Sequence, residues 1–269
     1  MTENDNAPQT YERVSTYKDQ QVTTVFDKKG RIVRVLAESS ATQPWEVSKL
    51  AGMIDHTLLK PEATASQIDQ LCREALEYGF GAVCVNSYWV KQCKKMLAGS
   101  PVKIAATIGF PLGAVSTKAK VSEAKRAIKD GAVEIDMVMN VGELKSGNLV
   151  AVARDIREVV IEAQKRQALV KVIIETCLLT DEEKVTACLI TKEAEADFVK
   201  TSTGFSTGGA NVEDVALMRD VVGDEMGVKS SGGIRSYADA IRMVEAGATR
   251  IGASSGIRIV EEELELAGS

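Results

Sequence analysis

Eight short apolar runs, spread over residues 53–256, limit what this 269-residue chain can fold into more than any other feature. Each run has the length of a β-strand, and apolar residues recur at helical spacing in stretches between them, such as TASQIDQLCREALEYG (64–79). Strands that alternate with helices predict a parallel sheet built from repeated βα units. The runs are MIDHT (53–57), AVCVN (82–86), VKIAATIG (102–109), VEIDMVMN (133–140), VKVIIET (170–176), DFVKTS (197–202), GVKSSGG (227–233) and RIGASSG (250–256).

A phrase recurs where a helical stretch ends and an apolar run begins. AIKDGAVEIDMVMN (127–140) and VEAGATRIGASS (244–255) both pass from a helix end through a glycine into a strand, and ALEYGFGAVCVN (75–86) is a looser copy. Glycine just past a helix favours the left-handed conformation that directs the chain into the next strand. The copy TKEAEADFVKTST (191–203) has Glu195 at the glycine position, where a left-handed glutamate costs roughly 1 kcal/mol relative to glycine.

Eight βα units are typical of a (β/α)8 TIM barrel, an α/β fold that we expect to span residues 45–269 as a single domain. An open doubly wound sheet is the alternative, but MIDHTLLK (53–60) stands where its first strand should be followed by a G-x-G-x-x-G turn. Residues 1–44 are polar and lack a helical stripe, so we interpret them as a flexible extension. Within them, QQVTTVFDKKGRIVRVLAE (20–38) alternates around a D-K-K-G turn and could form a β-hairpin.

The composition argues against several classes of function. The net charge is −5, acids and bases are mixed, and no run of eighteen apolar residues occurs, so we expect binding to neither nucleic acid nor membranes. The N-terminus lacks the apolar core of a signal peptide, which predicts a cytoplasmic protein. Five cysteines without a C-x-x-C motif predict reduced thiols. A single histidine, His56, excludes a histidine-rich metal site; it does not exclude a carboxylate-bound magnesium, but nothing in the sequence points to one.

Polar residues interrupt the apolar runs near their carboxyl ends, which is where a barrel of this kind carries its chemistry. Asp136 lies in the fourth run, Lys200 in the sixth and Lys229 in the seventh. Two inward lysines on neighbouring strands repel each other, and this repulsion together with burial lowers a lysine pKa. The resulting free amine attacks a carbonyl to form a Schiff base, and a carboxylate beside it can move protons through a bound water.

Two other runs carry polar side chains on one strand face. By the two-residue alternation of strands, Asp55 and Thr57 share a face of the first run and His56 points to the other. Lys171 and Glu175 share a face of the fifth run. An interior that gathers charged residues near one rim is hard to explain by stability alone.

Each candidate also has a purely structural interpretation. Asp136 and Lys229 could form an ion pair that only supports the barrel, and Lys200 could extend into solvent from its strand end. His56 is more typical of a hydrogen-bonded structural histidine than of a base. Cys84 lies in an apolar run and fits the core, with a lesser chance of lining the pocket.

Two turns rich in serine and glycine follow the last two runs. They are SSGGI (230–234) and GASSG (252–256). In barrels of this kind, the loops after the seventh and eighth strands often hold a phosphate with backbone N–H groups and a helix N-terminus. Together with the lysines, these turns indicate a Schiff-base aldolase that acts on a small sugar phosphate.

Seven segments closely resemble the class I deoxyribose-phosphate aldolases, and the resemblance covers about residues 45–260. The segments are IDHTLLKPEAT (54–64), IGFPLG (108–113), EIDMVMNVGELKSG (134–147), KVIIETCLL (171–179), FVKTSTGFSTGGA (198–210), VKSSGGIR (228–235) and RIGASSG (250–256). The resemblance implies reversible cleavage of 2-deoxy-D-ribose 5-phosphate to D-glyceraldehyde 3-phosphate and acetaldehyde, without metal or organic cofactor.

The resemblance also implies roles for individual residues. Lys200 matches the Schiff-base nucleophile, Lys229 its pKa-lowering neighbour, and Asp136 the group that transfers protons. We expect the substrate and its phosphate to be held by Asp55, Thr57, Lys171, Thr203, Gly204, Gly232, Gly233, Ser254 and Ser255.

Three positions depart from the family pattern. Ser230 stands where close relatives often carry alanine, and Phe205 stands where some carry a basic residue. With Phe205, the phosphate would rest more on backbone amides, and phosphate-free aldehydes would be better tolerated. The chain ends in ELELAGS, so the tail tyrosine of some relatives, and any proton relay through it, is absent.

Two other functions fit the same pattern. One is a different lysine-dependent barrel lyase, or an isomerase that uses Lys200 only electrostatically. The other is a non-catalytic protein that binds sugar phosphates, since a fold does not fix a function. Family resemblance and base rate favour a homodimer.

Overall fold

The computed structural model describes residues 10–17, 20–27, 32–37 and 48–267. The chain divides into two compact units, Met1–Glu46 and Val47–Ser269. The first unit holds a three-stranded antiparallel sheet in the order β1 (Thr10–Tyr17), β2 (Gln20–Asp27) and β3 (Ile32–Ala37). The segment whose alternation suggested a hairpin therefore contains two paired strands, β2 and β3, and the turn between them lies outside the described residues.

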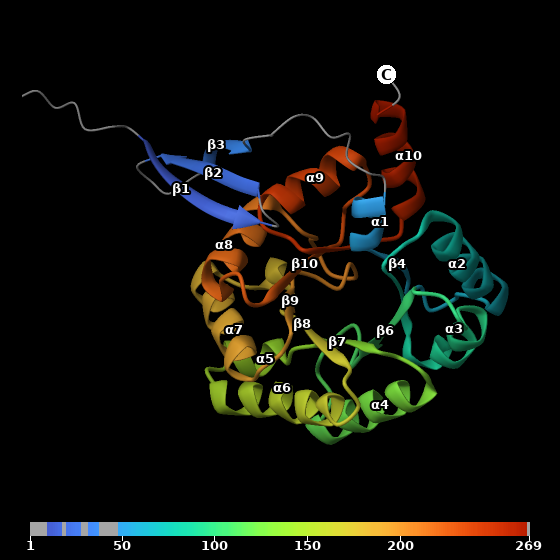
Figure 1. Cartoon of the computed structure of the whole chain (residues 1–269). Helices are drawn as coiled ribbons and strands as arrows, with labels where there is room; N and C mark the ends of the chain where they lie inside the picture. Colours follow the sequence, from blue (N-terminus) through green and yellow to red (C-terminus); the bar gives the residue numbers. More distant parts are fainter. Residues whose placement is uncertain (1–9, 18–19, 28–31, 38–47, 268–269) are drawn as a thin grey trace, which may run out of the picture. The chain divides into compact units, whose positions relative to one another are not determined.

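The second unit is a closed barrel of eight parallel strands surrounded by helices, which confirms the (β/α)8 expectation (Figure 1). Each strand pairs with the next along the chain, and the last pairs with the first. The doubly wound alternative is wrong, because its sheet would stay open. The strands are β4 (Ile54–Leu58), β5 (Ala82–Asn86), β6 (Lys103–Ile108), β7 (Glu134–Val138), β8 (Leu169–Ile173), β9 (Phe198–Lys200), β10 (Gly227–Ser231) and β11 (Arg250–Ala253).

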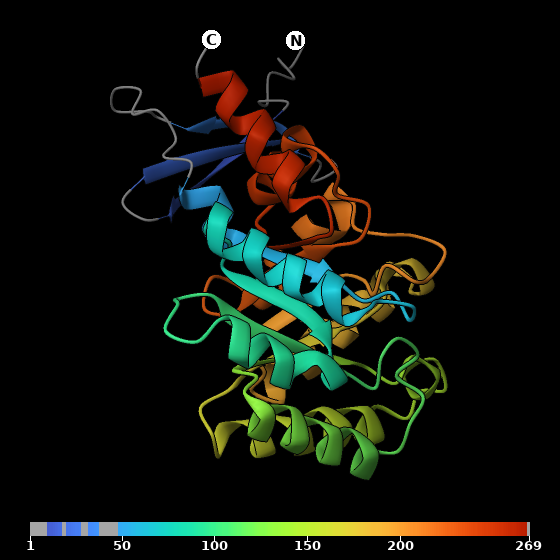
Figure 2. The ribbon, with the colours of Figure 1, turned by 90° about the vertical axis from the view of Figure 1, so that its right-hand side faces the viewer.

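The outer layer is a ring of helices, of which α4 and α6 lie side by side in both views (Figures 1 and 2). No helix among the described residues is long and apolar enough to span a membrane. The helices are α1 (Ser48–Met53), α2 (Ala65–Tyr78), α3 (Val90–Met96), α4 (Thr117–Asp130), α5 (Val141–Lys145), α6 (Leu149–Gln164), α7 (Asp181–Glu193), α8 (Val212–Val222), α9 (Tyr237–Glu245) and α10 (Gly256–Ala267), with short 3₁₀ turns η1 (Ser87–Trp89) and η2 (Thr176–Leu178).

Local sequence signals set where several helices begin and end. Thr64 caps α2 and Thr180 caps α7, each in a capping box with the residue three positions later. Gly79 ends α2 in the left-handed conformation, with a φ of 68°. Glu195, which stands at the glycine position of the repeated phrase, is left-handed with a φ of 58°, although it carries a side chain. These caps fix the points where the chain turns between each helix and the neighbouring strand.

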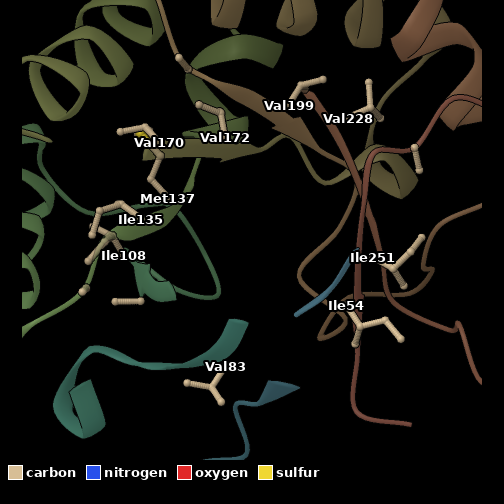
Figure 3. Close-up of a cluster of buried hydrophobic side chains, with 14 of the residues drawn as sticks. Ile54, Val83, Ile108, Ile135, Met137, Val170, Val172, Val199, Val228 and Ile251 are labelled. Carbon is tan, nitrogen blue, oxygen red and sulfur yellow. The ribbon is translucent and has the colours of Figure 1, made fainter. Parts of the chain in front are cut away.

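The hydrophobic core lies between the strands and the helices. Figure 3 shows apolar side chains contributed by successive strands, among them Ile54 of β4, Ile135 of β7 and Val199 of β9. Each is fully buried, and each is next to a charged residue, Asp55, Asp136 or Lys200, on the same strand. Because strand side chains alternate, packing the apolar set against the helices turns the charged set toward the barrel axis.

Candidate active site

The barrel interior holds a buried network of seven charged side chains. Four are basic and three are acidic, and none is more than 8% exposed. Isolated charges are costly to bury, so each needs a partner of opposite sign. The seven residues are Asp55, Glu134, Asp136, Lys171, Lys200, Lys229 and Arg250.

Asp136 joins the two lysines that the sequence singled out. Lys200 Nζ lies 2.8 Å from Asp136 Oδ2, and Lys229 Nζ lies 2.7 Å from the same oxygen. The pairing of β9 with β10 places Lys200 directly opposite Lys229. Both amines therefore reach one carboxylate oxygen, at the carboxyl end of β9 where Lys200 is the last strand residue.

The rest of the network continues from these three residues toward the other end of the barrel. Lys171 Nζ donates to Asp136 Oδ1 at 2.9 Å and also to Glu134. Asp55 accepts a hydrogen bond from Lys229, and it accepts another from Arg250 Nη1 at 2.7 Å.

Arg250 lies at the end of the network that is farther from Lys200. Its guanidinium also donates to the two carboxylate oxygens of Glu134, at 3.3 Å each. It starts β11, as Glu134 starts β7, so both residues lie at the opposite end of the barrel from Lys200. No charge in the network is left without a partner.

The charge count of this network leaves one cation in excess. If all four bases were protonated, they would outnumber the three carboxylates by one. Burial penalises an uncompensated charge, so one base is driven to its neutral form. Arginine does not lose its proton in proteins, so the neutral base is one of the three lysines.

Of these three lysines, Lys200 is the one whose pKa is lowered. Burial lowers the pKa of Lys200, and the nearby Lys229 ammonium lowers it further, against the opposing effect of Asp136. Although burial also favours the neutral amine at Lys229, the carboxylates of Asp136 and Asp55 raise its pKa. The same two carboxylates outweigh burial at Lys171 and raise its pKa too. Despite burial, the lysines Lys171, Lys200 and Lys229 hold the pKa of Asp136 well below its ordinary value.

Glycine-rich turns lie beside the carboxyl ends of β9, β10 and β11. Gly204, Gly232 and Gly233 have φ values of 82°, 88° and 82°, which favour glycine. A Cβ on Gly232 would lie 3.0 Å from Gly209 Cα and 3.6 Å from Gly204 Cα, so these backbones approach one another closely. Ser254 and Ser255 lie directly before α10. Exposed backbone N–H groups and a helix N-terminus suit a phosphate.

Residues 49–262 match the DeoC/LacD family of aldolases. The chain belongs to this aldolase family. A deoxyribose-phosphate aldolase from Streptococcus gordonii is 63% identical over 215 residues, which make up 80% of this chain and 97% of that protein. One from Thermococcus gammatolerans is 62% identical over 214 residues, 79% of this chain and 95% of that protein. The solved structure of a tetrameric deoxyribose phosphate aldolase from Aeropyrum pernix is 36% identical, with a TM-score of 0.77 over 82% of this chain and 93% of that one.

The aldolase brings most of the predicted residues to one end of the barrel. The ion pair between Asp136 and Lys229 is present, and it also includes Lys200. Lys200 does not extend into solvent, since it is 3% exposed and bonded to Asp136. Lys171 lies inside the network rather than beside the glycine turns, with its bonds directed to Glu134 and Asp136.

The two residues of the first strand occupy different positions. Asp55 is part of the network, whereas the Thr57 hydroxyl donates to the Asp55 carbonyl at 2.7 Å. His56 points away, as alternation predicts, and its Nε2 lies 2.7 Å from Glu74 Oε2. Burial lowers the pKa of His56 despite that carboxylate.

Cys84 is fully buried, and its Sγ lies 3.9 Å from Asp136 Oδ2. Leu59 and Ala105 pack with it in a small apolar cluster, and Phe110 lies against that cluster. Cys84 therefore belongs to an apolar wall next to the network. Phe205 is 50% exposed, and its ring meets that of Phe110 edge-on, with centroids 5.3 Å apart.

Sequence reasoning missed Arg250 and Glu134 as members of the network. Each lies at the start of its strand, two residues before an inward-facing position, Gly252 or Asp136. Two-residue alternation could therefore have placed both inside the barrel. Among the described residues, no group of three or more His, Cys, Asp or Glu side chains could hold a metal ion.

Proposed function

We propose that this aldolase cleaves 2-deoxy-D-ribose 5-phosphate reversibly to D-glyceraldehyde 3-phosphate and acetaldehyde, through a Schiff base on Lys200. One observation carries the proposal: Lys200 and Lys229 share a single carboxylate oxygen of Asp136 in an interior with one excess cation. That arrangement favours a free amine at Lys200 and a permanent ammonium beside it. The substrate is that of the relatives, which are named deoxyribose-phosphate aldolases.

The reaction begins at the aldehyde carbon of the open-chain sugar. The Lys200 amine attacks C1, and the resulting carbinolamine takes up one proton and loses water to leave a protonated Schiff base; the final hydrolysis returns that proton. A base removes the proton of the C3 hydroxyl, and the C2–C3 bond breaks. Its electron pair moves to C1–C2 and neutralises the nitrogen as an enamine, while C3 becomes the aldehyde of D-glyceraldehyde 3-phosphate.

The second half of the reaction returns the enzyme to its starting state. Protonation of the enamine at C2 gives the Schiff base of acetaldehyde, and water hydrolyses it to release acetaldehyde and the free amine. Asp136 is our candidate for the proton transfers, because its low pKa keeps it a carboxylate beside Lys200. Lys229 stays charged and opposes protonation of the amine.

The glycine and serine turns supply the phosphate end of the site in this proposal. Gly204, Gly232, Gly233, Ser254 and Ser255 lie after β9, β10 and β11. Backbone amides there would take the place of the basic side chain that Phe205 replaces. Thr57 and Asp55 would border the sugar on the other side.

Two further expectations stay predictions. We propose a homodimer in the cytoplasm. The relative from Aeropyrum pernix is tetrameric, so the number of subunits in this protein has to be measured rather than taken from a relative. Light scattering on the purified full chain would give it directly.

Borohydride reduction in the presence of acetaldehyde tests the proposed chemistry. Reduction converts a Schiff base into a stable ethyl adduct, which peptide mass spectrometry assigns to a residue. We expect the adduct on Lys200. An adduct on Lys229 instead would exchange the two lysine roles, and a folded protein with no adduct would contradict the Schiff-base mechanism and favour a purely electrostatic role for Lys200.

A further inference from the structure

Glu175 has an unusual backbone for a residue next to the site. It follows β8 and has a φ of 56° and a ψ of 66°, in the left-handed region. Among the described residues, Gln167 and Glu195 are the other non-glycine residues with positive φ, and both are exposed. Glu175 is only 4% exposed. A left-handed backbone costs a non-glycine residue about 1–2 kcal/mol, and it persists where the surrounding contacts hold the residue in place.

The carboxylate of Glu175 accepts three hydrogen bonds from Thr203 and a long one, at 4.0 Å, from the Cys177 thiol. The Thr203 backbone N–H donates to Oε1 at 3.2 Å and to Oε2 at 3.4 Å, and the Thr203 hydroxyl donates to Oε2 at 2.5 Å. The N–H of Phe205 then donates to the Thr203 hydroxyl oxygen at 3.0 Å. One buried carboxylate thus fixes the turn of residues 203–205 through both polar groups of Thr203.

The backbone on either side of Glu175 is bonded to the same segment. The Ile174 N–H donates to the Lys200 carbonyl at 3.0 Å, and the Thr176 N–H donates to the Thr201 carbonyl at 2.9 Å. These two bonds extend the pairing of β8 and β9 past the strand ends. They fix Glu175 between them, so that its side chain is directed at Thr203.

These contacts restrict what Thr203 can offer a ligand. Its N–H and its hydroxyl proton are both engaged by Glu175. A phosphate needs donors, so Thr203 cannot bind one while Glu175 holds it. The neighbouring Gly204 remains open, and a Cβ placed on it would meet only Gly232 Cα, at 4.0 Å.

We propose that Glu175 is a positioning residue for the phosphate end of the substrate. Its carboxylate holds Thr203, and the turn of residues 203–205 then keeps Gly204 facing Gly232 with their backbones open to the phosphate. This inference rests on the proposed function, because it assumes a phosphorylated substrate at these turns.

The test compares a phosphorylated and an unphosphorylated substrate. Glu175→Gln removes the negative charge and leaves one oxygen to accept the bonds that Thr203 donates to two. For 2-deoxyribose 5-phosphate we expect KM to rise roughly tenfold with a smaller change in kcat, since hydrogen bonds to a charged group are lost. For 2-deoxyribose, kcat/KM should change by less than about twofold. Equal losses on both substrates, or no loss on either, would overturn the role.

Two glycine variants distinguish the effect of the Glu175 carboxylate from the effect of its left-handed backbone. Glu175→Gly suits the left-handed conformation and removes only the side chain, so we expect the same selective loss as in Glu175→Gln. Glu195→Gly is the matched control, because Glu195 is also left-handed, is exposed, and pairs with Arg157 outside the site. Its kinetics should equal those of the wild type. Full activity in Glu175→Gly would contradict the proposal.

A binding measurement keeps the test independent of turnover. Inorganic phosphate should raise the wild-type Tm, and the rise should be smaller in Glu175→Gln and unchanged in Glu195→Gly. Borohydride trapping of acetaldehyde should be normal in Glu175→Gln, because acetaldehyde has no phosphate. Failure of trapping in the wild type would contradict the proposed function. An equal phosphate-induced rise in Tm in the wild type and in Glu175→Gln would instead contradict the role of Glu175.

Discussion

At the scale of single residues, we propose that Lys229 controls whether Lys200 carries a proton. Lys229→Leu leaves three bases and three carboxylates in the interior, so Lys200 can stay protonated without a charge excess. We expect turnover at pH 7 to fall at least tenfold, because one unit of pKa changes the free-amine fraction about tenfold. The remaining activity should increase as the pH rises toward the ordinary lysine pKa. A pH–rate profile checks this, and near-wild-type activity at pH 7 would contradict it.

Arg250→Gln tests whether the excess positive charge of the network changes the pKa of Lys200 without direct contact. Arg250 bonds to Asp55 and Glu134, whereas Lys200 bonds to Asp136. Arg250→Gln also removes the excess cation, so the acid limb of the pH–rate profile should move to higher pH, by less than in Lys229→Leu because Arg250 is not adjacent to Lys200. Circular dichroism must first show a folded protein. An unchanged acid limb would mean that only the immediate neighbours of Lys200 set its pKa.

At the scale of the elements, a buried ion pair joins two helices outside the barrel. Lys120 of α4 bonds to Asp155 of α6, with side chains 0% and 7% exposed. Lys120→Met leaves Asp155 buried without its cation, so we expect a loss of about 3–5 kcal/mol in the free energy of unfolding. Lys120→Met/Asp155→Leu should recover most of that loss, because both charges are gone. Urea unfolding measures both variants.

An exposed pair on α4 provides the control for this comparison. Arg126 and Asp130 form an i,i+4 bridge, with the arginine side chain 68% exposed. Arg126→Met should change the free energy of unfolding by less than about 1 kcal/mol. Equal losses in Lys120→Met and in the double variant would show that packing volume, rather than the unpaired carboxylate, decides the cost.

The elements also show what sequence alone could predict. Six of the eight barrel strands fall within the apolar runs, and β4 and β8 extend one residue beyond theirs, because the alternation and the length of a strand are local signals. Strand alternation correctly predicted that Asp55 points inward and His56 outward, and the repeated phrase marked Glu195 as a position where a left-handed backbone could occur. Each of these features depends on residues a few positions apart.

Long-range pairing could not be predicted in the same way. The partners of Arg250 are 195 and 116 residues away along the chain, and only the closure of the barrel brings them together. The left-handed backbone of Glu175 has no glycine or repeat to mark it, because tertiary contacts with Thr203 hold it. Both features depend on strand register, which local sequence does not specify.

At the scale of the whole molecule, the barrel unit should act without the first 46 residues. Every member of the charged network lies within Val47–Ser269, and the family match begins at residue 49. The relative from Streptococcus gordonii aligns over 97% of its length with only 80% of this chain. A protein of the relatives' length therefore contains the whole barrel, and we expect a chain starting at Val47 to fold.

The kinetics of that shortened chain decide the role of the N-terminal sheet. If β1, β2 and β3 take no part in catalysis, kcat and KM for 2-deoxyribose 5-phosphate should match those of the full chain, and borohydride should still trap acetaldehyde on Lys200. A folded shortened chain with a loss of more than roughly tenfold in kcat/KM would mean that residues 1–46 supply more than about 1.4 kcal/mol of transition-state stabilisation. Since the barrel network would be intact in that protein, such a loss would assign the missing contribution to the N-terminal unit itself.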